Sequence, residues 1–273
     1  MPSESTLKQY AMRMAILAKA GVDIHTPTDV FTWLESNGHG LSSQKLYIAS
    51  IQNTLGASSP PVYREKIKDI FKVLKEKESK QLLTDKQQSN FVKWTELVAA
   101  QAKLAGMQKT DVQWKQYVVV SLYTLNAPVR ADYGAMEVHT RRDKSRTENE
   151  LIWNSKPTFI FRKYKTAGGY GVVEIPVSKP LVAVLKEWFQ HLGSVPKYLL
   201  GETATSSNTF AVYIAETFKK HTGKSLGVSL IRHSYITHVY PTLRSLAKKE
   251  ELARRMLHST ERQERYISLK DMD

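Results

Sequence analysis

The side chains best suited to chemistry lie in the last fifth of the chain: Arg232 and His233, then His258, then Tyr266. A phenol is a poor nucleophile at neutral pH because its pKa is about 10. It becomes useful when cations surround the electrophile and stabilise the negative charge that develops. A phosphodiester is the substrate for which Arg, Lys and His are all useful at once. We therefore expect a tyrosine that attacks a phosphate of DNA.

Composition favours the same kind of substrate. The 273 residues carry a formal net charge of +14, and the pI is near 9.7. Such an excess of positive charge favours a polyanionic partner, usually nucleic acid, through counterion release and long-range attraction. A basic protein whose charge serves solubility is the alternative. Because the charge recurs on several predicted helices and is not confined to one tail, nucleic acid is the favoured partner.

The sequence excludes several other classes. Cysteine is absent, which rules out disulfides, thiolate zinc sites and a cysteine nucleophile. No run is long and apolar enough to span a bilayer, and the N-terminus lacks the apolar core of a signal peptide. We expect an intracellular, soluble protein of the nucleus or cytoplasm. No metal or other cofactor is expected, because the following carboxylates lack ligand spacing: Asp132, Glu137, Glu148 and Glu150.

Residues 1–80 are predicted to form a small helical domain. Apolar residues recur at helical spacing, and the fourth helix has a strongly cationic outer face. Its buried stripe is expected to hold Tyr63, Ile67, Ile70, Phe71 and Leu74. The four helices are expected over 4–20, over 27–35 with Thr26 as N-cap, from a cap at Ser42 or Ser43, and after the Ser-Ser-Pro-Pro break at 58–61.

A second domain, 83–273, is predicted after a charged linker over 75–86. Helical patterns start near Phe91 and cover 114–125, where three consecutive valines indicate burial on more than one side. From Thr158 the apolar period changes to two, and it resumes after a glycine-rich turn, which predicts a β-hairpin. Lys165 is expected where the first strand meets the turn. Further helices are expected over 181–192 and 209–220, so the fold class is mainly α with a small β-sheet or hairpin.

Taken together, these residues resemble the tyrosine recombinase (phage integrase) family, which is marked by an arginine early in the catalytic domain, a hairpin lysine, a His-x-x-Arg box, a later histidine or tryptophan, and a tyrosine. Pro128-Val-Arg130 matches the first arginine, and Tyr164-Lys165-Thr166 matches the hairpin lysine. Ser229–Thr237 matches the box, with Arg232 in place, while Leu257-His258-Ser259 and Tyr266 match the last two elements. The match covers residue 83 to the C-terminus, and the N-terminal helices resemble the family's DNA-binding domain only in size and number.

The resemblance implies a fold, a reaction and partners. The fold would be a two-domain, C-shaped DNA clamp made of a helical SAM-like core-binding domain and a mixed α/β catalytic domain. Tyr266 would attack the scissile phosphorus without metal or ATP, leaving a 3′-phosphotyrosine and a 5′-hydroxyl. Arg130 and Arg232 would clamp the phosphate, His258 would hydrogen-bond to it, and Lys165 would protonate the leaving oxygen. The partners would be double-stranded DNA with inverted-repeat core sites and further copies of the chain, from dimer to tetramer.

One residue departs from the family pattern. The box begins with Ser229 where a histidine is usual, and serine is no base near neutral pH. His233 or water would then take the proton, or the step would run without a dedicated base. Other candidate DNA contacts are polar or cationic and less specific: Ser229, His233, Lys163, Arg141, Lys45 and Lys68.

Three readings remain open from sequence. The first is a site-specific recombinase or integrase, and the segment Ala127–Tyr133 looks most like members from large DNA viruses and mobile elements. The second is a type IB topoisomerase, which shares the tyrosine chemistry but works as a monomer. The third is a DNA-binding protein that keeps the fold with weakened catalysis, for which Ser229 is the motivating feature. The resemblance also implies a C-terminal segment that docks on a neighbouring subunit; because only seven residues follow Tyr266, that tail would be short, or the helix that carries Tyr266 would itself be exchanged.

Overall fold

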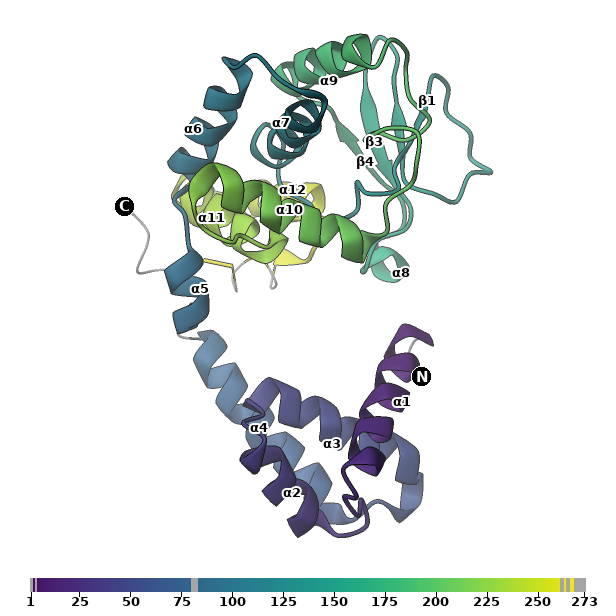
Figure 1. The fold of residues 1–273 in the computed structure, drawn as a ribbon, viewed down its shortest axis with the longest axis vertical. Coiled ribbons are helices and arrows are strands. Elements are labelled where there is room, and N and C mark those ends of the chain that lie inside the picture. The colour runs from purple at the N-terminus through teal and green to yellow at the C-terminus, as the bar shows by residue number, and fades with distance from the viewer. Residues whose placement is uncertain (1, 3, 80–82, 261–262, 264–265, 268–273) are drawn as a thin grey trace. The chain divides into compact units, whose positions relative to one another are not determined.

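The computed structural model of the protein describes residues 2, 4–79, 83–260, 263, 266 and 267. By its internal contacts the chain divides into two compact units, Met1–Lys80 and Gln81–Asp273 (Figure 1). In the described part of the chain, helices predominate and the strands belong to a single small sheet in the second unit. None of the helices there is both long and apolar enough to cross a membrane.

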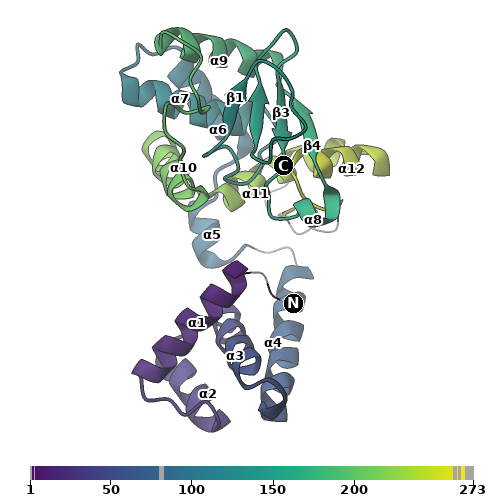
Figure 2. The ribbon, with the colours of Figure 1, turned by 90° about the vertical axis from the view of Figure 1, so that its right-hand side faces the viewer.

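The first unit is built from four helices, with α3 packed against both α1 and α4 (Figure 2). Its core includes Leu17, Leu34, Ile48 and Tyr63, all almost completely buried. The Tyr63 hydroxyl donates a hydrogen bond to the Ile24 carbonyl at 2.9 Å, which ties α4 to the loop before α2. The bounds are α1 Glu4–Lys19, α2 Pro27–Ser36, α3 Leu41–Leu55, the 3₁₀ turn η1 Gly56–Ser58, and α4 Pro61–Ser79.

Two expectations for this unit are wrong. Phe71 is 55% exposed, because one residue turns a helix by about 100° and places it at the edge of the stripe centred on Ile70. The ammonium of Lys45 covers its ring instead, 5.1 Å from the ring centroid. The third helix begins at Leu41 with Gly40 as N-cap, so neither Ser42 nor Ser43 caps it.

The expected linker over 75–86 is largely helical. Helix α4 runs to Ser79, and α5, Asp85–Asn90, already begins before the expected linker ends. Thr84 explains that start, because its hydroxyl accepts a hydrogen bond from the Gln87 N–H while the Gln87 side chain accepts from the Thr84 N–H. Residues 80–82, in the middle of the expected linker, lie outside the described part.

The second unit is organised around α7, whose Val118, Val119 and Val120 are fully buried. Helices α6, α9 and α10 surround it, which confirms the burial on several sides that the valine run indicates. A continuous core joins these helices to the sheet. The bounds are α6 Trp94–Ala105, α7 Asp111–Thr124, α9 Lys179–His191, α10 Ser207–Thr222, α11 Val228–Val239, the 3₁₀ turn η2 Tyr240–Thr242, and α12 Leu246–Arg255.

The sheet has the order β1-β2-β3-β4, with β1 Glu137–His139, β2 Glu150–Ile152, β3 Thr158–Phe161 and β4 Val173–Pro176. The first pair is parallel and the other two are antiparallel. The β3–β4 hairpin is therefore as expected, with Phe159 opposite Ile175. Its connection contains a short helix, α8 Ala167–Tyr170, so Lys165 lies four residues beyond the end of β3 and not where that strand meets the turn.

Candidate functional site

The two arginines of the predicted site meet on one pair of backbone carbonyls. Arg232 lies on α11, and its Nη1 donates to the carbonyls of Met256 at 2.9 Å and Pro128 at 3.1 Å. Arg130 follows α7, and its Nη1 donates to the carbonyl of the next residue, Leu257, at 3.2 Å. Side chains separated by more than a hundred residues are thus brought together by the turn that ends α12.

The shape of that turn depends on an unusual backbone conformation. Leu257 has a φ of 56° and is the one non-glycine residue with positive φ in the described part of the chain. This conformation is unfavourable for a side chain with a Cβ. It closes α12 through hydrogen bonds from the Leu257 N–H to Arg254 and from the His258 N–H to Ala253. The Leu257 side chain is 2% exposed, so apolar burial in the core offsets the backbone cost.

Arg232 is almost completely buried, at 1% exposure. A guanidinium buried this deeply is expected to have a carboxylate partner or a bound phosphate. The structure instead gives backbone carbonyls as the acceptors of Nη1, and Nε and Nη2 have no acceptor at hydrogen-bonding distance and angle among the described residues. Burial lowers the pKa of Arg232, while the nearby Tyr266 opposes that shift. Buried guanidinium donors without acceptors are costly, and they suit an anionic ligand.

Tyr266 packs beside this arginine within the same chain. Its ring centroid lies 5.1 Å from the Arg232 Cζ, 5.7 Å from the His258 ring and 4.7 Å from the His233 ring. The Tyr266 carbonyl accepts a hydrogen bond from His233 Nδ1 at 2.9 Å. Four side chains from three separate segments therefore form one cluster.

His233 holds the segment that carries Tyr266. Because a carbonyl can only accept, His233 Nδ1 must carry the proton of the hydrogen bond. Burial lowers the pKa of His233 to about 4, so the imidazole is neutral at pH 7. Such a group is a weak base, and its contact in this structure is with main chain.

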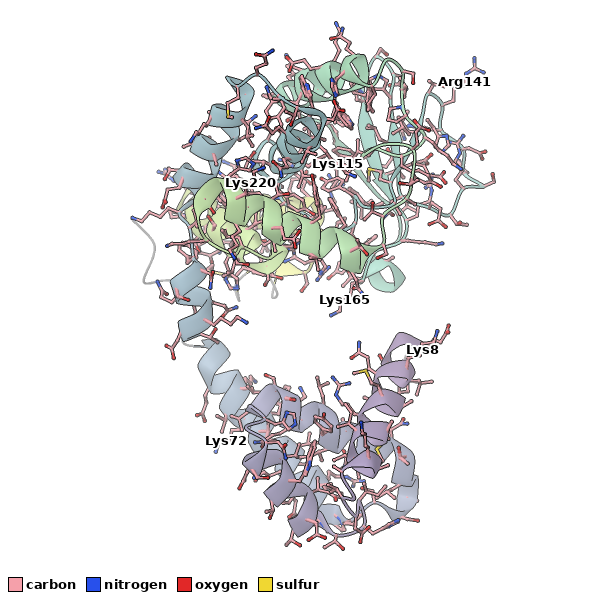
Figure 3. The ribbon with its side chains drawn as sticks, viewed as in Figure 1. Lys8, Lys72, Lys115, Arg141, Lys165 and Lys220 are labelled. Atoms are coloured by element: carbon pink, nitrogen blue, oxygen red, sulfur yellow. The ribbon has the colours of Figure 1, made fainter. Side chains whose placement is uncertain are left out.

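An open cleft of about 700 Å³ lies beside the arginines. Arg130, Asp132, Lys163 and Lys165 line it, together with the first residues of α10. The hydroxyl of Thr166 donates to the Leu257 carbonyl at 3.1 Å, the same oxygen that Arg130 uses. Lys165, the residue before, is exposed and projects beside α8 (Figure 3). The segment that carries Lys165 is thus held, through Thr166, at the same carbonyl as Arg130.

The cleft does not reach every member of the predicted set. Arg232, His258 and Tyr266 are 1%, 3% and 8% exposed, and they are not part of its described lining. The phenol would have to move to meet a phosphate held by Arg130 in the cleft.

Asp132 belongs to the site although the sequence reasoning set it aside. It lines the cleft, and its Oδ2 has no hydrogen-bond partner among the described residues. Burial raises its pKa from 3.8 to about 6, although the positive charges of Arg130 and Arg232 oppose the shift. Its position two residues after Arg130 could have indicated this place in the site. The spacing of carboxylates, which indicates metal ligands, could not.

A pH dependence of stability follows from that shift. A carboxyl whose pKa rises on folding stabilises the fold below pH 3.8, and this contribution is lost as the pH rises through about 6. We expect the difference in unfolding free energy between Asp132→Asn and the parent to change by up to about 3 kcal/mol from pH 4 to pH 7. Denaturant titrations over this range measure it. Asp69→Asn, at an exposed position of α4, is the control. A difference for Asp132→Asn that does not change with pH would contradict the assignment.

Asn149 is a second residue that sequence reasoning missed. Its Nδ2 donates to the carbonyls of Asp132 at 3.2 Å and Lys163 at 2.9 Å. Its Oδ1 accepts from the N–H groups of Arg162 and Lys163, both at 2.8 Å. The side chain therefore joins the segment that carries Arg130 to the one that carries Lys165. An asparagine in a loop gives no signal of such a role in sequence.

The less specific candidates lie in scattered places. Ser229 is exposed in the first turn of α11, and Arg141 is exposed in the loop after β1 (Figure 3). Lys163 forms an ion pair with Glu148. Lys45 and the exposed Lys68 belong to the first unit. Among the described residues, no group of three or more His, Asp or Glu side chains is arranged to hold a metal ion.

No protein-family model matches the chain. A search of curated proteins also finds no match. Among solved structures, the crystal structure of XerA recombinase aligns with 99% of this chain and 89% of its own, with 15% sequence identity and a TM-score of 0.45.

Proposed function

We propose that this chain is a tyrosine recombinase that cuts and rejoins DNA through a 3′-phosphotyrosyl intermediate. The observation that carries the proposal is the convergence of Arg130 and Arg232 on the carbonyls of Leu257 and Met256, with the Tyr266 ring 5.1 Å from the Arg232 guanidinium. The five residues of the family pattern lie in one unit of the chain. Viral or mobile-element DNA, and its integration, excision or resolution, are the contexts we propose.

In the proposed step, the Tyr266 phenolic oxygen bonds to phosphorus as the bond to the 5′-oxygen breaks. The guanidiniums of Arg130 and Arg232 stabilise the negative charge on the two non-bridging oxygens. The Nη1 atom of each donates to neutral carbonyls, so the phosphate competes for these guanidiniums with dipoles and with the charge of the nearby Asp132. His258 hydrogen-bonds to the same phosphate. With a pKa of about 4, His233 is too weak a base to take the phenol proton efficiently, and Ser229 cannot replace a histidine, so we assign that proton to water.

Lys165 is the proposed general acid, and a substrate change tests this role. Lys165→Ala is expected to slow cleavage by about 10²- to 10⁴-fold, because the 5′-alkoxide then leaves without a proton. A substrate with sulfur in place of the 5′-bridging oxygen should restore most of the rate, since a thiolate leaves without protonation. Rates are measured from single-turnover adduct formation. Lys156→Ala, an exposed lysine beyond the cleft, is the control, and a Lys165→Ala defect that sulfur does not relieve would exclude the acid role.

The proposed DNA complex uses both units. We propose that they close on opposite faces of the duplex as a C-shaped clamp, with Lys45 and Lys68 contacting the backbone from the core-binding unit. Arg141, Lys163, Ser229 and the imidazole of His233 are further candidate contacts. The proposed sites are inverted repeats, bound by a dimer that pairs into a tetramer for strand exchange. The tail 268–273, which could join subunits, lies outside the described residues.

Covalent trapping tests the proposal. The full chain is incubated with a pool of randomised duplexes that carry nicks, from which a cut strand loses its short 5′-hydroxyl end and cannot be rejoined. We expect an adduct that survives denaturing gels, maps to Tyr266 by peptide mass spectrometry, and enriches one sequence. Absence of any adduct despite DNA binding would overturn the proposal in favour of the catalytically weakened DNA-binding protein. Relaxation of any supercoiled plasmid by a monomer would instead indicate a type IB topoisomerase.

A further inference from the structure

The connection between β3 and β4 carries two large apolar side chains that are more than half exposed. Tyr170 is 54% exposed and Val172 is 55% exposed, and both follow the exposed Lys165 closely. We call residues 165–172 the ribbon tip. Figure 2 shows α8 at the end of the two-stranded ribbon. Exposing a large aromatic and a β-branched side chain together at a projecting end favours contact with a further surface.

The ribbon tip has a defined conformation. The Tyr164 hydroxyl donates to the Gly171 carbonyl at 2.7 Å, and Thr166 donates to the Leu257 carbonyl. Gly171, with a φ of 64°, reverses the chain between Tyr170 and Val172. One of these hydrogen bonds joins the ribbon tip to the preceding Tyr164, and the other joins it to Leu257. Because Arg130 donates to the same Leu257 carbonyl, the two bonds fix the position of the ribbon tip relative to Arg130.

The charge around the ribbon tip indicates what it meets. Lys165, Lys163 and Arg130 line the adjoining cleft, and the chain has a net charge of +14. A polyanion that carries apolar faces matches this combination, and stacked bases between phosphates supply both. Four helical residues rise roughly 6 Å, close to two base steps at about 3.4 Å each. A phosphate beside Lys165 would therefore place Tyr170 near the next one or two base steps.

We propose that Tyr170 and Val172 form an apolar wedge that enters the minor groove and partly unstacks the base step next to the cleaved phosphate. Side chains of this kind open base steps in other DNA complexes, and the energy of opening depends on the step. Pyrimidine–purine steps are the easiest to deform. The wedge would thereby select the sequence at the cleavage position without a hydrogen bond to a base. This inference rests on the proposed function and adds a mechanism by which the proposed site would select the DNA sequence at the cleavage position.

The test compares the wild-type chain with a double variant, Tyr170→Ser with Val172→Thr, on the randomised nicked duplexes. Both positions are exposed, so folding should be retained, as checked by circular dichroism. The double variant should still form the Tyr266 adduct. Its preference at the step beside the trapped phosphate should fall from about tenfold to within about twofold. Val212→Thr, 58% exposed on α10, is the matched control and should keep the full preference.

A second measurement reports the unstacking directly. With 2-aminopurine at the selected step, the wild-type chain should raise the fluorescence on binding, and the double variant should not. An unchanged sequence preference, or an equal fluorescence rise, in the double variant would overturn the wedge while leaving the recombinase proposal intact. Loss of the wild-type adduct altogether would instead overturn the proposed function. Bound duplexes with 2-aminopurine at each position in turn would then decide the wedge: a fluorescence rise with the wild-type chain but not with the double variant supports it, and no such difference overturns it.

Discussion

Replacing Tyr266 by Phe is expected to abolish the covalent DNA adduct, with a loss of at least about 10⁴-fold in cleavage. The ring would still pack against His233 and His258, and the main-chain hydrogen bond from His233 would remain. The change therefore removes the nucleophile and the phenol's interaction with the Arg232 guanidinium, while the packing of the ring is kept. DNA affinity, measured by fluorescence anisotropy, should stay within about twofold, because most of it comes from phosphate contacts elsewhere.

The control for this variant is Tyr235→Phe, on the same unit of the chain. The Tyr235 ring packs against Trp94 in a tilted arrangement, with ring centroids 4.7 Å apart. Tyr235 has no role in the proposed reaction, so its phenol should be dispensable for the adduct. An adduct formed by Tyr266→Phe would place the nucleophile elsewhere. Loss of DNA binding in Tyr266→Phe would show that the phenol is needed for the fold of the site. In that case a second substitution, Tyr266→His, would be used to test the adduct.

Arg232→Lys is expected to slow cleavage by about 10²- to 10³-fold, the usual effect of removing one donor from a transition-state oxyanion. The guanidinium donates from one nitrogen to two carbonyls, of Met256 and Pro128, and has two further nitrogens for phosphate. An ammonium is a single point of charge and cannot do both. We also expect the unfolding free energy to fall by about 1–3 kcal/mol, because a buried carbonyl loses its donor.

Single-turnover cleavage and denaturant titration separate the two effects. Arg244→Lys is the control, since Arg244 is exposed and should change neither quantity appreciably. If Arg232→Lys loses stability but cleaves at the parental rate, Arg232 acts only as a brace between α11 and the turn after α12, and the proposed phosphate clamp is wrong.

Much of the helical framework could be predicted from sequence, because apolar spacing reports which face of a helix is buried. The ends were less accessible: Gly40 caps α3 although two serines stand just after it. Strands β1 and β2 were not expected, because each has three residues and β2 begins with a glutamate. Glu150 is buried there because Arg146 and Arg162 pair with it at 2.8 Å and 2.5 Å, a partnership that no periodicity reveals.

The candidate site shows the same division. The five residues of the proposed reaction could be named from sequence, because their order along the chain resembles a specific family pattern. The contacts that hold these residues in place could not be predicted from sequence. The acceptors for Arg130 and Arg232 are main-chain carbonyls, and every residue carries one. The positive φ of Leu257, which aims two of these carbonyls, is equally silent in sequence, since leucine rarely adopts it.

The choice of carbonyls as acceptors has an energetic consequence for the whole molecule. A carbonyl is a dipole, so it orients a guanidinium without cancelling its charge. Arg130 and Arg232 therefore stand close together, one of them deep in the protein, with Asp132 as a nearby carboxyl, and Arg130 contributes to lowering the pKa of Arg232. Folding assembles this mutual repulsion in advance. In the proposed complex, an incoming phosphate would relieve it, so part of the proposed affinity for DNA would originate as stability that the unliganded protein lacks.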